Sequence, residues 1–129
     1  MKVEISQQGG VGGISRRLII ESNLITFLNS KRGDSEAERH SYQLTEDEVE
    51  EVRDAVMKVF SDTAVRNRYG YEVMSDCMEI NFSLEIDGNK KTINTISDPG
   101  DPLPQELHDL YNLYWKLLWK RTSPSPPSQ

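Results

Sequence analysis

The stretch from Met78 to Ile86 constrains the fold more strongly than any other part of the chain. Apolar and polar side chains alternate through it, which is the period of a β-strand with one buried face. Asp87-Gly88-Asn89 follows, and an Asp-Gly step favours a tight hairpin turn because both residues accept positive φ angles. The return strand is expected over residues 91–96. One face of this hairpin is apolar, so the fold must supply a second layer to cover it.

A second hairpin is predicted at the N-terminus. Val3 and Ile5 alternate with polar neighbours, and Leu18 and Ile20 repeat the pattern on the return. The segment between them is rich in glycine, which adopts positive φ angles at little cost. Its glycines are Gly9, Gly10, Gly12 and Gly13. Because it matches neither the Walker nor the dinucleotide-binding pattern, we expect a hairpin turn, or a turn that contacts a partner.

A third hairpin is predicted over residues 24–44. Residues 24–28 are an apolar run with strand-like composition, and residues 40–44 are the expected return strand. Residues 31–40 between them are polar and charged, and they include Asp34. Such a segment buries little apolar surface, so we expect a mobile loop.

Two helices are expected in the remaining sequence. Thr45 and Glu48 form a Thr-x-x-Glu capping box at the start of the first helix, which should end near Asp62. The second follows the proline-containing turn 97–104. Both have apolar residues at helical spacing. These residues are Val49, Val52, Val56, Val59 and Phe60 in the first helix, and Leu107, Leu110, Tyr114, Leu117 and Leu118 in the second.

The order of these elements predicts an α+β fold. We expect an antiparallel β-sheet of four or more strands, built from hairpins, with two α-helices packed on one face. A chain of 129 residues has the size of one domain. That domain is expected over residues 1–121, followed by a disordered Pro/Ser-rich tail over residues 122–129.

Charge and cysteine content narrow the classes of function. The net charge of −6 disfavours nucleic-acid binding, which requires clustered Lys and Arg, and suits a partner with a basic or metal-containing cleft. Cys77 is the single cysteine, so no intramolecular disulfide can form and a cytoplasmic location is expected. No signal-peptide pattern and no membrane-spanning apolar run is present in the sequence, so we expect no membrane association.

The sequence indicates neither a catalytic site nor a cofactor or metal site. His40 and His108 lack metal-ligand spacing, and protein zinc sites need three or four ligands. No pattern supplies a nucleophile together with its base. The acidic run 46–54 is better explained as the solvated start of a helix. Trp115 and Trp119, four residues apart, are better explained as the rim of the core or a dimer seam than as a ligand cage. We therefore expect a protein without enzymatic activity.

Residues 63–77 are the candidate partner-binding segment. A connection of this length in a small domain is either functional or a tolerated insertion, and the sequence alone leaves both open. It contains Tyr69, Gly70 and Tyr71, whose tyrosines are good rigid contact residues, and Asp76 close to its end.

The N-terminal motif suggests a family. The motif is Gly9-Gly10-Val11-Gly12-Gly13-Ile14, followed by Arg16 and Arg17. The expected elements after it are a helix over 44–60, a segment ending in Asp76, the Asp87-Gly88 hairpin and a leucine helix after Leu103-Pro104. In this motif and this order the chain resembles the emfourin family of bacterial protein inhibitors of thermolysin-like metallopeptidases. The resemblance covers most of residues 1–120. Val11-Gly12-Gly13 stands where the family pattern has Phe-Ala-Gly, and residues 23–43 are longer than the family's segment.

The resemblance implies a non-enzymatic inhibitor that inserts surface loops into the active-site cleft of a thermolysin-like zinc metallopeptidase. A catalytic zinc keeps one position for water, which a carboxylate from an inhibitor loop can displace. We assign that role to Asp76 as a hypothesis, with Tyr69, Gly70 and Tyr71 beside it. Asp34 lies on a second candidate arm.

A second hypothesis stays open at this point. The same sheet and aromatic helix suit a protein–protein interaction or assembly module, homodimeric through Trp115 and Trp119, without protease inhibition. A small hydrolase is disfavoured because no acid–base or nucleophile set is visible.

Overall fold

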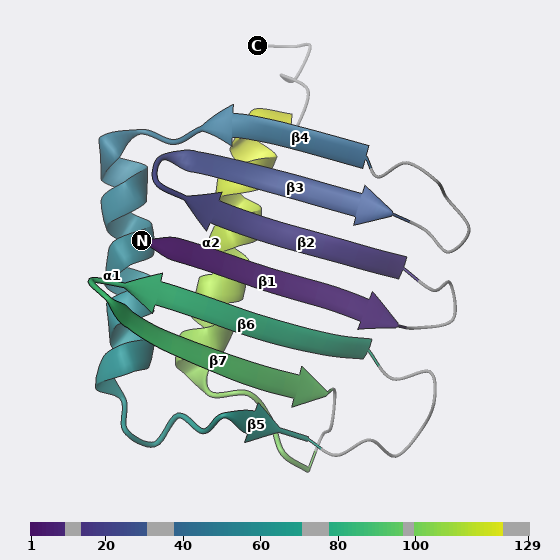
Figure 1. Cartoon of the computed structure of the whole chain (residues 1–129), viewed down its shortest axis with the longest axis vertical. Coiled ribbons are helices and arrows are strands. Elements are labelled where there is room, and N and C mark those ends of the chain that lie inside the picture. Colours follow the sequence, from purple (N-terminus) through teal and green to yellow (C-terminus); the bar gives the residue numbers. More distant parts are fainter. Residues whose placement is uncertain (10–13, 31–37, 71–77, 97–99, 123–129) are drawn as a thin grey trace, which may run out of the picture.

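The computed structural model describes residues 1–9, 14–30, 38–70, 78–96 and 100–122. It is an α+β fold in which a seven-stranded, mostly antiparallel sheet carries two helices on one face, as predicted (Figure 1). In chain order the elements are β1 (Lys2–Gly9), β2 (Ile14–Glu21), β3 (Leu24–Ser30), β4 (Glu38–Gln43), α1 (Glu46–Ser61), β5 (Arg68–Tyr69), β6 (Met78–Ile86), β7 (Asn89–Ile96) and α2 (Gln105–Thr122).

The strand order across the sheet is β4-β3-β2-β1-β6-β7-β5. The three predicted hairpins are present as β1–β2, β3–β4 and β6–β7, each antiparallel. β1 also pairs with β6, so the N-terminal strand lies at the centre of the sheet. Only the short β5 runs parallel to its neighbour among the described strands.

Alternation along each strand separates a buried face from a polar one. Val3 and Ile5 of β1 are fully buried against the helices, and Leu18 and Phe82, the register partners of Ile5, are buried beside them. The helices cover this face with the apolar side chains predicted to form their stripes. The buried helical residues include Val52, Val56, Val59, Leu107, Leu110, Tyr114, Leu117 and Leu118.

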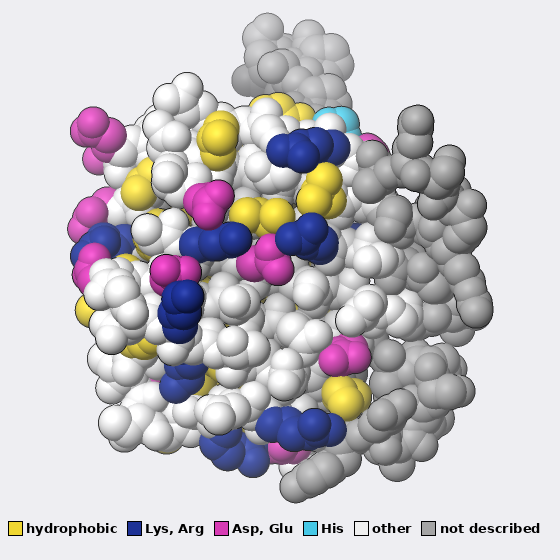
Figure 2. Space-filling model, in the orientation of Figure 1, with side chains coloured by type: hydrophobic (Ala, Val, Ile, Leu, Met, Phe, Trp, Pro, Cys, Tyr) yellow, Lys and Arg dark blue, Asp and Glu magenta, His cyan; other side chains and the backbone are white. Residues whose placement is uncertain are grey.

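The opposite face of the sheet is open and polar. Figure 2 shows charged side chains of both signs interspersed over it. Arg17 donates to Glu4 at 2.8 Å, and Lys2 lies 3.8 Å from Glu21, so neighbouring strands are bridged by ion pairs. Antiparallel sheets often leave one face to water in this way.

The local signals for turns and caps are confirmed. Glu48 donates its amide to Thr45 Oγ1 at 3.2 Å and accepts from the Thr45 amide at 2.9 Å, which completes the predicted capping box of α1. Asp87 and Gly88 have φ angles of 50° and 83°, as a two-residue hairpin turn of the I′ type requires.

Several boundaries differ from the prediction, and β3 and β7 each include two more residues than expected. β4 begins at Glu38, so residues 38–39, which were predicted to lie in the loop before the return strand, belong to the strand. Cross-strand pairing to residues 28–29 compensates for their polar character. β5 lies inside the segment predicted to be irregular. α2 includes Thr122, which the prediction placed in the tail; residues 123–129 lie outside the described residues.

Candidate partner interface

One end of the sheet collects the strand termini that flank the predicted partner-binding segments. Gly9 pairs with Ile14 on one side and with Met78 on the other, Ser15 pairs with Ser30, and Glu79 pairs with Ile96. We call this the connection end and define it by Gly9, Ile14, Ser30, Glu38, Met78 and Ile96. Figure 1 shows these termini along one edge of the molecule.

The opposite end of the sheet is closed by short turns. Ser22 and Asn23 join β2 to β3, and Asp87 and Gly88 join β6 to β7. Residues 10–13, 31–37 and 71–77, by contrast, all begin and end at the connection end. Strands are spaced by about 4.8 Å, so the row from β4 to β5 is roughly 29 Å wide. This width matches a standard interface, which covers about 800 Å² per partner.

A polar clasp fixes the chain where it enters residues 71–77. The Arg66 guanidinium forms an ion pair with Asp101, and the Gly70 amide donates to the other Asp101 oxygen at 2.8 Å. Arg66 also lies over the Tyr69 ring, with its Cζ 4.4 Å from the centroid. The Gly70 hydrogen bond and the Arg66 pair together lower the pKa of Asp101. The clasp joins β5 to the segment that precedes α2.

Gly70 is placed at the point where the chain leaves β5. Its φ angle of 79° lies in the left-handed region, which favours glycine. Glycine at this position therefore allows the backbone to turn as it leaves β5, and Asp101 accepts a hydrogen bond from the glycine amide.

Tyr69 does not provide the exposed contact that was predicted. Its side chain is only 5% exposed and packs in the core, and its hydroxyl accepts from the Arg66 amide at 2.7 Å. Parallel pairing of β5 with β7 turns this side chain inward. In its described position the ring cannot enter a partner's cleft, and we correct its role to anchoring the segment that follows.

The arginines of the N-terminal motif lie on different faces of β2. Arg17 is on the open face and is engaged by Glu4. Arg16 is half-buried on the helix-covered face, in register with Gln7 and Asn29. Within the described residues Arg16 makes no ion pair.

Unpaired polar atoms gather on the covered face near the connection end. Gln7 Oε1, Arg16 Nε and Asn29 Oδ1 are buried and have no hydrogen-bond partner within the described residues. The three side chains lie on adjacent strands in one row, and Gln7 Nε2 donates to the Tyr111 hydroxyl at 2.6 Å. Buried polar atoms without partners cost free energy, and folds keep them mostly at functional or strained sites.

Several predicted residues lie outside the described part of the chain. They are Asp34, Tyr71, Asp76, Cys77 and the glycines Gly10, Gly12 and Gly13. The flanking residues of each segment are described, so its anchors are known: Gly9 and Ile14, Ser30 and Glu38, and Gly70 and Met78. Asp76 stands two residues before Met78, which begins β6 between β1 and β7.

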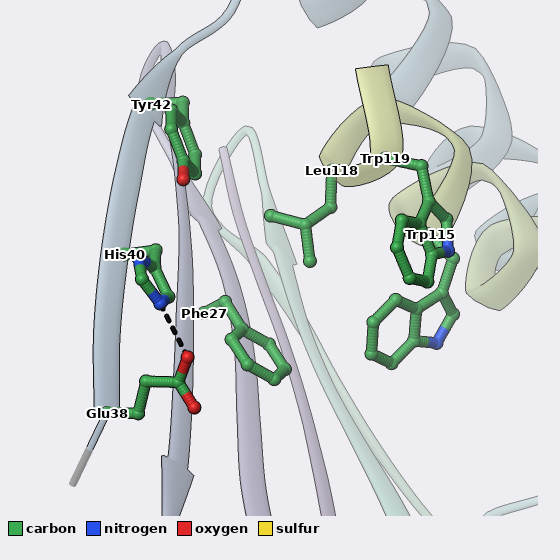
Figure 3. Close-up of a pocket in the computed structure, with 7 residues that line it drawn as sticks. All are labelled: Phe27, Glu38, His40, Tyr42, Trp115, Leu118 and Trp119. Atoms are coloured by element: carbon green, nitrogen blue, oxygen red, sulfur yellow. Dashed lines mark hydrogen bonds and ion pairs between the residues drawn. The ribbon is translucent and has the colours of Figure 1, made fainter. Parts of the chain in front are cut away.

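The sequence prediction missed an aromatic cavity between the sheet and α2. It has a volume of about 340 Å³ and lies beside the edge strand β4. His40, Tyr42 and Phe27 come from the sheet, and Trp115 and Trp119 come from α2 (Figure 3). The residues from the sheet and those from α2 are far apart in sequence. Pairing of β3 with β4 brings Phe27 beside His40 and Tyr42. The four-residue spacing of the two tryptophans was the one visible signal.

No group of three or more His, Cys, Asp or Glu side chains in ranges 1–9, 14–30, 38–70, 78–96 and 100–122 could hold a metal ion. In the same part of the chain no helix is long and apolar enough to cross a membrane.

No protein-family model matches the chain, and no curated protein matches it significantly.

Proposed function

We propose that this protein is a non-enzymatic inhibitor of a thermolysin-like zinc metallopeptidase, which it contacts with the connection end of its sheet. The observation that supports the proposal is that the strand ends flanking residues 10–13, 31–37 and 71–77 lie at one end of the sheet. Residues 63–77 were predicted as a partner-binding segment from the residues alone, and the segment with Asp34 was added through the family resemblance. A rigid sheet that presents several segments in one row is well suited to a cleft.

The chemistry of the proposal is zinc ligation in trans. Asp76 supplies a carboxylate that displaces the water on the peptidase's zinc. Its segment is held at both ends, by the Asp101 clasp before it and by β6 after it. Fixed ends reduce the conformational entropy lost on binding and so increase affinity. Asp34 belongs to the segment between β3 and β4 and serves as a second contact.

Inhibition kinetics test the proposal. Purified protein is titrated into a thermolysin-like peptidase, and the inhibition constant is compared with that of Asp76→Asn. A ligand to a buried zinc is a hot-spot contact, so we expect the variant to lose at least about 30-fold in potency, equivalent to about 2 kcal/mol.

A matched control comes from the other end of the sheet. Asp87 is an exposed carboxylate in the β6–β7 turn, bonded by Arg53 at 2.6 Å. Asp87→Asn should inhibit like the unmodified chain. Equal potency of Asp76→Asn would remove Asp76 from the mechanism. Absence of inhibition by the unmodified chain, together with a stable dimer through Trp115 and Trp119, would instead support the assembly-module hypothesis.

A further inference from the structure

We infer that one row of side chains on the covered face of the sheet binds a carboxylate group. We call it the polar row and define it by Gln7, Arg16 and Asn29, which lie on β1, β2 and β3. The inference does not depend on protease inhibition. It rests on a half-buried guanidinium that has no acidic partner within the described residues, and on the unpaired polar atoms on either side of it.

The register of the sheet fixes the polar row. Gln7 is paired with Arg16, and Arg16 is paired with Asn29, so the three side chains stand on neighbouring strands. Gln7 is 5% exposed, and its Nε2 donates to the hydroxyl of Tyr111 on α2 at 2.6 Å. Gly9 and Ile14 follow two residues beyond the row, which therefore lies next to the connection end.

Arg16 differs from the other half-buried arginines of the described chain. Arg53 bonds Asp87 at 2.6 Å, and Arg121 bonds Glu48 at 2.9 Å. Arg16 has neither an ion pair nor a hydrogen bond within the described residues, and its Nε is buried. Its two Nη atoms are not among the buried unpaired atoms, so they remain in contact with water. A partly desolvated charge without a counter-charge costs free energy, which a bound anion would offset.

The two amides beside Arg16 can adapt to an anion. Rotating the Gln7 amide by about 180° exchanges its oxygen and nitrogen, and the Tyr111 hydroxyl can donate to the oxygen as readily as it accepts from the nitrogen. The unpaired position of Gln7 Oε1 then carries an N–H donor. The same rotation of Asn29 replaces its unpaired Oδ1 by Nδ2. The polar row can therefore present N–H donors on both sides of the guanidinium.

Charge and shape select a carboxylate as the ligand. Arg16 is the one cation among the described residues of the row, which suits a singly charged group better than a phosphate. A guanidinium donates two parallel hydrogen bonds to a planar carboxylate. Glu38, in register with Asn29, lies 2.7 Å from His40 Nε2 and forms no ion pair with Arg16. A carboxylate from outside the described chain would therefore supply the missing counter-charge.

Nuclear magnetic resonance of the full chain tests the inference. Sodium acetate replaces sodium chloride at constant ionic strength while the Arg16 Nε–H signal is followed, and acetamide is titrated in parallel. We expect a saturable shift with acetate and at least about tenfold weaker binding of acetamide, which lacks the charge. The Arg53 Nε–H signal should not shift in this way, because Asp87 already occupies that guanidinium. No saturable shift at Arg16, or equal binding of the two compounds, would overturn the inference.

Two further arms identify the source of the carboxylate. A short peptide with a free C-terminal carboxylate is compared with its amidated form and with acetate. Tighter binding of the free peptide than of acetate would indicate a protein ligand, and equal binding would indicate a free organic acid. Inorganic phosphate that binds more tightly than either would overturn the choice of a carboxylate.

Variants connect the signal to the polar row. Arg16→Lys keeps the charge but loses the planar fork, so acetate binding, followed through the Gln7 side-chain amide, should weaken at least about tenfold. Arg17→Lys is the matched control on the open face and should leave binding unchanged. Acetate binding unaffected by Arg16→Lys would contradict the inference.

Thermal unfolding without ligand gives a second, independent readout. Arg16→Met keeps an unbranched apolar side chain and removes the charge, so the midpoint should stay equal or rise. Asn29→Asp places an acid beside Arg16, which should raise the midpoint and abolish acetate binding. A midpoint lowered by several degrees in Arg16→Met would show that the guanidinium serves the fold and would overturn the inference.

Discussion

The Glu48 carboxylate connects the N-cap residue Thr45 and helix α1 to helix α2. It completes the capping box of α1, and it accepts from Arg121 Nη1 of α2 at 2.9 Å. Lys120 lies 3.8 Å from it, and the side chain is only 11% exposed. Hydrogen bonds from Arg121, the main cause, and from Thr45 lower the pKa of Glu48 from 4.5 to about 2. The sequence predicted the cap, but the partner on α2 is 73 residues away and could not be predicted.

Glu48→Gln should therefore destabilise the protein in a pH-dependent way. The folded-state pKa is depressed, so the stabilisation is full above about pH 4.5 and is lost as the pH falls toward 2. We expect a loss on the order of 2–3 kcal/mol in the free energy of unfolding at pH 7, and a difference close to zero near pH 2. Urea unfolding at several pH values measures it.

Glu50→Gln is the matched control for this change. Glu50 is exposed on the same helix, and its replacement should alter the free energy of unfolding by less than about 0.5 kcal/mol at every pH. A Glu48→Gln difference that persists unchanged at pH 2 would show that charge at this position does not contribute to stability.

Tyr69 shows where prediction from single residues fails. Tyrosine in an irregular polar segment is typical of a contact residue. The two-residue strand β5 is too short to have an alternation pattern, so nothing in the sequence indicated that this tyrosine is buried. The inward orientation follows from parallel pairing to β7, which is a tertiary property.

Among the elements, α2 holds the sheet through both apolar packing and specific hydrogen bonds. Its leucine stripe was predictable from periodicity. Tyr114 is buried, with 1% of the residue exposed. Its hydroxyl donates to the Thr26 carbonyl of β3 at 2.5 Å, and burial raises the pKa of Tyr114. This hydrogen bond connects the centre of α2 to the half of the sheet that carries the aromatic cavity.

Tyr114→Phe isolates that hydrogen bond because it preserves the ring. We expect a loss of about 1–2 kcal/mol in the free energy of unfolding, the cost of a buried hydrogen bond. Thermal or urea unfolding measures it, and Tyr42→Phe, in a half-buried position on β4, provides a control with a smaller effect. Equal effects of the two substitutions would argue against a special role for the Thr26 contact.

The β5 clasp is a second contribution that only the fold reveals. Asp101→Asn removes the ion pair with Arg66 and weakens the acceptor for the Gly70 amide. We expect faster amide hydrogen exchange at Gly70, with little change in the global free energy of unfolding because the clasp lies at the edge of the sheet. In the unmodified chain, the protection of the Gly70 amide, measured relative to its intrinsic exchange rate at each pH, should fall on acidification, since Asp101 has a lowered pKa and loses its charge only at low pH.

Asp109→Asn, on the exposed side of α2, should leave exchange at Gly70 unchanged. If Asp101→Asn also had no effect there, the clasp would not order the start of residues 71–77. The inhibition constant of Asp101→Asn, compared with that of the unmodified chain, would show whether the clasp matters for the proposed function.

For the molecule as a whole, the sequence predicted the class of fold and its hairpins because alternation and Asp-Gly turns are local signals. The order of strands was not predictable, since the pairing of β1 with β6 joins segments about 80 residues apart. That pairing places Gly9, which precedes residues 10–13, beside Met78, which follows residues 71–77. Convergence at one end is therefore a consequence of topology.

The two ends of the sheet therefore differ in how their strands are connected. The turn end is closed by two-residue turns with positive φ angles at Ser22, Asp87 and Gly88. The connection end combines the strand ends that flank the predicted contact segments with a row of buried polar atoms that lack hydrogen-bond partners within the described residues. The central claim is that the connection end is the surface that a metallopeptidase contacts.

Amide hydrogen exchange of the complex tests this claim most directly. The chain is labelled alone and with a saturating thermolysin-like peptidase, and exchange is compared peptide by peptide. We expect slower exchange in the complex than in the free chain for segments 10–13, 31–37 and 71–77. Exchange in the turns at residues 22–23 and 87–88 should be unchanged. Protection confined to the turn end or to the exposed side of α1, or no protection at all, would contradict it.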